Sequence, residues 1–226
     1  NIDGLDIAAR SLYCDETGGD YFDFIGNDTK QLNVVIGDVS GHGISSAILM
    51  ASVRAFLRQR AHLPGNLSRI LSDVNRQLIT DVEDSGNFMT LFYLRLDPVK
   101  RCLSWIRAGH DPAIFYHPFS DRFDDMHGKG TALGITKQAV FEENEKTGLT
   151  PGQIIVLATD GVWEARNKEG NMFGKEPLYH IVRQNRNAVA EDILGKSFQS
   201  LEEFQTEAVR EDDITMVVIK IVDLDS

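Results

Sequence analysis

Cysteines, long apolar runs and basic side chains are all scarce in this sequence of 226 residues. Its two cysteines, Cys14 and Cys102, are too few for a disulfide scaffold and favour a reducing compartment. No apolar stretch approaches the ~18–20 residues that span a bilayer, and the start of the chain has no signal-peptide pattern. We therefore expect a cytoplasmic protein that makes no membrane contact through this part of the chain.

The deficit of basic residues gives the chain a formal charge of −11, from 23 Lys and Arg against 34 Asp and Glu. Phosphate backbones are bound by Lys and Arg, so this balance argues against nucleic acid as a partner. The apolar fraction of 42% and the charged fraction of 25% are typical of a folded globular protein. With no repeat, low-complexity stretch or linker, residues 1–226 are expected to form one domain. The lack of an initiator methionine suggests a domain cut from a longer regulatory protein.

Three familiar kinds of site are absent as well. A cysteine phosphatase needs Cys-x5-Arg, but Asp20 and Ala108 stand where the arginines would follow the two cysteines. No Cys/His spacing fits a zinc site. Residues 190–197 match a relaxed P-loop pattern, but they are predicted to be helical and no strand precedes them, as a P-loop requires. The chemistry must therefore come from other residues.

Apolar runs and turn residues predict strands that come in groups and helices that come in pairs. Residues 44–62 and a segment that starts at Asn66 carry apolar residues at helical spacing. Residues 118–150 are polar and show little periodic signal. Strands without strict β-α alternation favour an α+β fold with largely antiparallel sheets. The predicted strands are 5–13, 20–25, 31–38, 88–96, 102–108, 112–117, 153–159 and 213–222, with further helices at about 175–185 and 188–206.

Several aspartates fall at the ends of these predicted strands. Asp20 and the Asp212-Asp213 pair begin strands, whereas Asp38 and Asp160 end them. Starts and ends of antiparallel neighbours lie side by side, and a turn centred near residues 28–29 places Asp20 opposite, or nearly opposite, Asp38. Like charges across a ladder are destabilising, and a hard cation such as Mg²⁺ or Mn²⁺ reverses that effect. The pattern indicates a carboxylate metal site, although any one of these aspartates alone is more typical of a turn.

Five short motifs occur in the order found in one family. The sequence resembles the PPM-type metal-dependent serine/threonine phosphatases, and most of all their bacterial SpoIIE/RsbU branch. The resemblance spans nearly the whole chain and implies a four-layer α-β-β-α sandwich with two mainly antiparallel sheets and a two-metal site at one end. The motifs are Gly18-Gly19-Asp20-Tyr21-Phe22-Asp23, Gly37-Asp38-Val39-Ser40-Gly41-His42-Gly43, Ala108-Gly109-His110-Asp111-Pro112, Ala158-Thr159-Asp160-Gly161 and Asp212-Asp213-Ile214-Thr215.

The resemblance also implies a set of ligands for two Mn²⁺ or Mg²⁺ ions. Asp20 and Asp38 are expected between the two metals, with Asp38 bridging them, and Val39 is expected to offer its backbone carbonyl. Asp23 is expected either behind the ligands or facing solvent. The remaining implied ligands are Asp160 and Asp212, with Asp213, where the family often has asparagine, as a runner-up.

The implied chemistry is attack of a metal-activated water on the phosphorus of a phosphoserine or phosphothreonine. His42 is a candidate for protonating the leaving alkoxide, with a structural turn as its other interpretation. His110 is expected to be structural rather than catalytic. The helix at 44–62 starts one residue past Gly43, so a shift of this helix is hypothesised to drag Val39 and switch metal binding. An ordinary core helix is the alternative.

The expected substrate is a phosphorylated signalling protein, and within the resembled branch it is a STAS-domain anti-sigma-factor antagonist. An upstream sensor or regulator domain and a homodimer are further expected partners, in bacterial stress or developmental signalling. One alternative is a non-catalytic metal-binding interaction module of the same fold. A nucleotide-cyclising enzyme is the remaining rival, because Gly18–Phe22 superficially matches the GGDEF signature, with Tyr21 in place of its acid.

Overall fold

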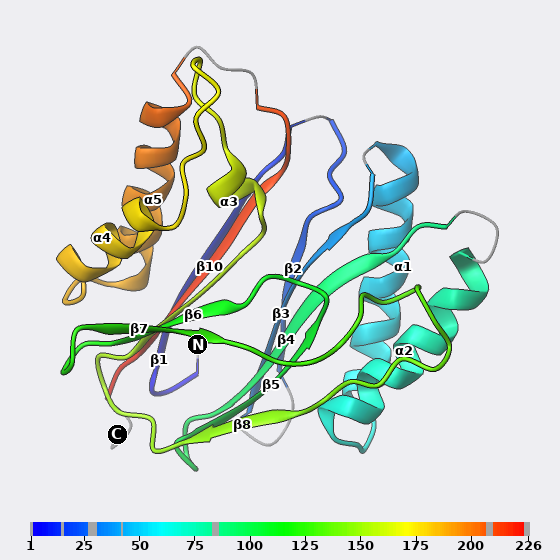
Figure 1. Cartoon of the computed structure of the whole chain (residues 1–226). Helices are drawn as coiled ribbons and strands as arrows, with labels where there is room; N and C mark the ends of the chain where they lie inside the picture. Colours follow the sequence, from blue (N-terminus) through cyan, green and yellow to red (C-terminus); the bar gives the residue numbers. More distant parts are fainter. Residues whose placement is uncertain are drawn as a thin grey trace.

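Two antiparallel sheets of five strands form the centre of the fold in the computed structural model (Figure 1). The structure describes residues 2–14, 16–26, 31–41, 43–82, 86–206 and 210–223. In sheet order, the first sheet consists of β1 (Leu5–Leu12), β10 (Ile214–Ile221), β9 (Ile154–Ala158), β6 (Ala113–His117) and β7 (Arg122–Met126). The second consists of β2 (Tyr21–Gly26), β3 (Leu32–Val39), β4 (Met89–Asp97), β5 (Cys102–Ala108) and β8 (Asn144–Thr147).

Helices cover the outer face of each sheet, which gives four layers (Figure 1). The pair α1 (Ile44–Ala61) and α2 (Leu67–Val82) packs on the second sheet. The first sheet is covered by α3 (Gly161–Glu164), α4 (Glu176–Gln184) and α5 (Ala190–Phe204). A third apolar cluster fills the space between the sheets. The α+β class and the α-β-β-α order of layers, both predicted from the sequence, are confirmed.

The central strands are apolar along their whole length because both of their faces are buried. Every residue of β9 is buried, and β3 and β10 each have a single partly exposed position. In β10, Val217 and Ile219 face the other sheet, whereas Met216 and Val218 pack against helices. These strands form the rigid frame whose ends carry the candidate site.

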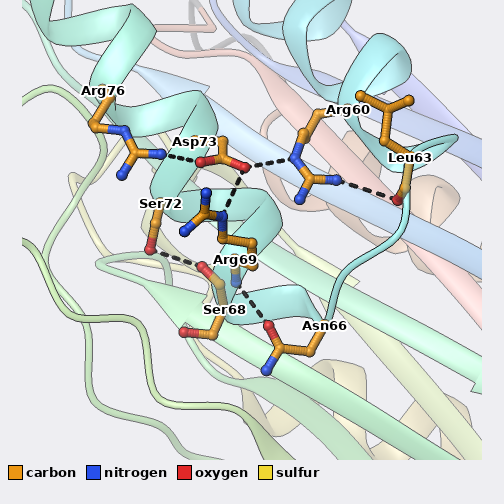
Figure 2. A network of polar contacts seen from close by, with 8 residues as sticks. All are labelled: Arg60, Leu63, Asn66, Ser68, Arg69, Ser72, Asp73 and Arg76. Carbon is orange, nitrogen blue, oxygen red and sulfur yellow. Dashed lines mark hydrogen bonds and ion pairs between the residues drawn. The ribbon is translucent and has the colours of Figure 1, made fainter.

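An aspartate with three arginines fastens α1 to α2 (Figure 2). Arg60 of α1 donates its Nε–H to Asp73 of α2 at 2.6 Å, and Arg69 and Arg76 also pair with this carboxylate. Asn66 caps α2 as predicted, because its side-chain oxygen accepts the Arg69 N–H at 2.9 Å. The two helices are therefore joined by directional bonds as well as by packing.

The predicted elements agree with the structure to within two residues at most of their ends. The region 118–150 differs, because it contains β7 and β8, whose side chains are mostly polar and partly exposed at the sheet edges. The short helix α3 was not predicted either. None of the helices within the described residues is long and apolar enough to span a membrane.

Candidate metal centre

Asp20 and Asp38 lie at the same edge of the second sheet. Tyr21 of β2 pairs with Gly37 of β3, and the next position in this register sets Asp20 opposite Asp38. The side chains of both aspartates point to the same face of the sheet as Phe22, which packs in the cluster between the sheets. Both therefore lie on the face that looks toward the first sheet. Asp20 is 2% exposed, whereas Asp38 is half-buried.

Asp160 and Asp212 lie at the matching edge of the first sheet. Asp160 lies two residues past Ala158, the last residue of β9, and the register of β9 with β10 brings it level with Ile214, two residues past Asp212. The Thr159 hydroxyl donates a hydrogen bond of 2.8 Å to Oδ2 of Asp20 and so joins the two sheet edges. The predicted set of aspartates is therefore gathered at one end of the sandwich.

Burial and neighbouring negative charges favour the protonated forms of Asp20 and Asp38. Burial raises the pKa of Asp20 to about 7, against the hydrogen bonds from two threonines that lower it. The pKa of Asp38 is raised to about 8, first by burial and then by neighbouring negative charges. In decreasing order, these charges are those of Asp20, Asp160, Asp212 and Asp213. The repulsion shows that the carboxylates act on one another across this edge.

The two outer aspartates are perturbed in the same direction. Burial raises the pKa of Asp160, and the negative charge of Asp111 adds to the effect. Burial likewise raises the pKa of Asp212, with further contributions from nearby acids. These carboxyls thus lack nearby positive charges that would stabilise their ionised forms.

Gly19 keeps a space open in front of this edge. A side-chain carbon at Gly19 would lie 3.1 Å from the carbonyl oxygen of Val39 and 3.3 Å from Oδ1 of Asp38. Both oxygens therefore face the place that a side chain would fill. A cavity of about 450 Å³ opens here, and its lining includes Gly19, Asp38, Asp212 and Asp213.

The donors around this cavity suit divalent cations. They are carboxylate oxygens and the backbone carbonyl of Val39, the hard ligands that Mg²⁺ and Mn²⁺ prefer. Across the described part of the chain, no three His, Cys, Asp or Glu side chains are grouped closely enough to hold an ion as they stand. These residues still suit divalent cations, because a bound cation would offset both the burial and the repulsion that raise the pKa values of Asp20 and Asp38.

Asp213 uses both of its oxygens to hold the loop that carries Asp20. Its Oδ1 accepts the Cys14 N–H at 2.9 Å, and its Oδ2 accepts the N–H groups of Gly19 at 2.9 Å and Asp20 at 3.4 Å. A side-chain carbon at Gly18 would lie 2.4 Å from the same Oδ2, so only glycine fits there. The Gly18-Gly19 pair is thus explained by two carboxylates, because that of Asp213 lies close to Gly18 and that of Asp38 lies close to Gly19.

Sequence reasoning missed the threonines that support the site. Thr159 Oγ1 donates to Asp20 and accepts the Thr215 N–H at 3.0 Å. Thr90 of β4 shares a 2.8 Å hydrogen bond with Nδ1 of His110. Burial lowers the pKa of His110 to about 4, so its ring is neutral at physiological pH. Thr159 lies inside one of the five motifs, whereas Thr90 lies far from all of them, and the roles of both residues depend on the register of the two sheets.

Replacing Thr159 by valine keeps the shape of the side chain and removes the hydroxyl that orients Asp20. We expect the affinity for Mn²⁺ to fall by about 10-fold, since partners that orient metal ligands typically contribute this much. Titration of Mn²⁺ followed by electron paramagnetic resonance measures the change. Thr80→Val is the matched control, because Thr80 is exposed on α2. Wild-type affinity in Thr159→Val would contradict this role.

The sandwich is a fold that is known from solved structures. The SiaA-PP2C domain of Pseudomonas aeruginosa superposes with a TM-score of 0.84 at 19% identity, over 95% of this chain and 85% of that one. The RsbU and RsbW domains of Rv1364c from Mycobacterium tuberculosis give 0.83 at 23% identity, over 98% and 62% of the chains. The fold is therefore that of the PP2C phosphatase domains.

The sequence comparison names the family. A family model described as stage II sporulation protein E (SpoIIE) matches residues 28–222, and the chain belongs to this family. The phosphoserine phosphatase RsbU of Bacillus subtilis is 28% identical over 96% of this chain. The protein IcfG of Synechocystis is also 28% identical, over 89% of it. The chain spans 64% of the length of RsbU and 35% of that of IcfG.

Proposed function

We propose that this chain is a metal-dependent protein serine/threonine phosphatase. The observation that carries the proposal is that Asp20, Asp160 and Asp212 lie close enough to Asp38 for their charges to raise its pKa, beside a cavity that Asp38 and Asp212 line. Membership of the SpoIIE family and the name of the RsbU relative support the same reaction. The reaction is hydrolysis of a phosphoserine or phosphothreonine by water.

Two Mn²⁺ or Mg²⁺ ions would be held by Asp20, Asp38, Asp160, Asp212 and the carbonyl of Val39. When bound, such a pair supplies a water of lowered pKa and neutralises charge on the phosphoryl oxygens. Asp38 would have to be deprotonated to bind a cation. The negative charges of its neighbours oppose this deprotonation when no cation is bound. We assign Asp213 to positioning the Asp20 loop, because both of its oxygens accept backbone N–H groups.

A proton must reach the leaving serine or threonine oxygen in this reaction. His42 stays our predicted donor and lies outside the described residues. His110 does not suit the role, because it is buried and its pKa is lowered to about 4. His42→Ala is therefore the variant that assigns the general acid.

The physiological substrate would be a phosphorylated signalling protein. By analogy with the family, we propose a STAS-domain anti-sigma-factor antagonist, an upstream regulator domain, and a homodimer as the partners to test. A cytoplasmic location remains the expectation from the sequence.

Hydrolysis of p-nitrophenyl phosphate and of a phosphoserine peptide tests the proposal. We expect turnover that depends on Mn²⁺, is abolished by EDTA, and is lost in Asp38→Ala. A folded wild type that binds Mn²⁺ but hydrolyses neither substrate would favour the non-catalytic interaction module. Conversion of GTP to a cyclic product would favour the nucleotide-cyclising rival.

A further inference from the structure

Asp23 is a buried carboxylate that the proposed reaction does not use. It lies on β2, three residues after Asp20, and is 6% exposed. Tyr21 and Ile25, which are in phase with it on this strand, pack in the apolar cluster beneath α1 and α2. The side chain therefore faces α1 rather than solvent.

Arg58 of α1 forms a two-pronged ion pair with this carboxylate. Its Nε–H donates to Oδ2 and its Nη2–H to Oδ1, each at 2.6 Å. The Tyr21 hydroxyl donates to Oδ2 at 2.7 Å, and the Phe24 N–H donates to Oδ1 at 2.9 Å. Burial raises the pKa of Asp23, but the hydrogen bonds from Arg58 and Tyr21 outweigh this effect and hold that pKa below its ordinary value.

Packing by itself does not fix how α1 is turned about its own axis. The helix buries Leu49, Val53 and Leu57, yet Ile44 and Ile48 on its outer side are 72% and 63% exposed. A helix with apolar residues on both sides has no single preferred face toward a sheet. A bidentate arginine–carboxylate pair has one geometry, so it supplies the orientation that the apolar residues leave open.

The orientation of α1 matters because the Arg58–Asp23 pair joins α1 to β2, and each of these elements lies next to a predicted metal ligand. The helix follows Val39 after a short connection, and β2 begins directly after Asp20. We infer that Arg58 is a positioning residue for the metal centre, which through Asp23 fixes the Val39 carbonyl relative to Asp20. This inference rests on the proposed function.

The test compares two arginines of the same helix pair. Arg58→Gln removes the pair with Asp23, whereas Arg76→Gln removes an exposed guanidinium from the Asp73 cluster (Figure 2). We expect Arg58→Gln to weaken Mn²⁺ binding, measured without substrate by electron paramagnetic resonance, by about 10-fold or more. Its kcat should approach the wild-type value at saturating Mn²⁺. Arg76→Gln should bind Mn²⁺ like the wild type.

Two further variants guard against a trivial loss of structure. Arg58→Lys keeps the charge without the two-pronged bond and should fall between wild type and Arg58→Gln. Asp23→Asn combined with Arg58→Gln should weaken Mn²⁺ binding no more than Arg58→Gln alone, because each acts through the other.

Three results would overturn the inference. One is wild-type Mn²⁺ affinity in folded Arg58→Gln, and another is an equal loss in Arg76→Gln. The third is an additive loss in the double variant. A wild type that binds no Mn²⁺ refutes the proposed function itself and is thereby told apart from a failure at Arg58.

Discussion

Replacing Asp38 by asparagine is expected to make the metal-free protein more stable and the enzyme almost inactive. Burial, and after it the negative charges of neighbouring acids, raises the pKa of the half-buried Asp38 carboxyl to about 8. A neutral amide of the same shape removes that repulsion. It also removes the predicted bridging ligand, so Mn²⁺-dependent hydrolysis should fall by about 100-fold or more.

The thermal midpoint in EDTA measures the first effect and p-nitrophenyl phosphate hydrolysis the second. We expect a midpoint several degrees higher than that of the wild type at a pH of about 8. Asp125→Asn is the control, because it removes the same charge from an exposed position on β7. A variant that is less stable than the wild type in EDTA, or one that keeps its activity, would contradict the assignment of Asp38.

The stability of the metal-free protein is expected to fall as the pH rises from about 4 to about 8. The folded-state pKa values of Asp20 and Asp38 are about 7 and about 8, whereas an unfolded aspartate titrates near ~3.9. Between these limits the folded state binds more protons than the unfolded state, so deprotonation favours unfolding. The destabilisation is absent below the unfolded pKa and complete above the folded ones.

Mn²⁺ should reverse this trend, because cations bind the deprotonated carboxylates. We therefore expect Mn²⁺ to raise the thermal midpoint by about 5 °C or more at pH ~8 and by much less at pH ~5. Scanning calorimetry in EDTA and in Mn²⁺ across this range measures both curves. The dependence of this Mn²⁺ effect on pH should be weaker in Asp38→Asn. An Mn²⁺ effect of equal size at both ends of the range would show that these carboxylates do not take up the ion.

The sheets and their acidic edge were predictable because local chemistry determines them. Continuous apolar runs such as Ile154–Ala158 mark strands buried on both faces. The sequence has turn residues between the two strands, so counting from a turn there predicted the juxtaposition of Asp20 and Asp38 that the register of β2 and β3 shows. The strands β7 and β8 lie at sheet edges with polar, partly exposed residues, so no apolar alternation marked them.

The residues that hold the candidate ligands in place were not predictable, because their roles depend on contacts between segments that are distant in the sequence. Asp212 and Asp213 are adjacent in sequence, and only the fold shows that Asp213 accepts N–H groups from the Gly19 loop. Thr159 reaches Asp20 across 139 positions, and Arg58 reaches Asp23 across 35. A sequence pattern finds the candidate ligands, whereas the residues that orient them appear only in three dimensions.

The central claim is that two divalent ions sit between the aspartates at this sheet edge. Diffraction from crystals soaked in Mn²⁺, measured at the manganese absorption edge, tests it directly. We predict two anomalous peaks, with oxygens of Asp20, Asp38, Asp160, Asp212 and Val39 within about 2.0–2.3 Å of one or the other. No peak at this edge, or peaks bound only by other residues, would contradict the account.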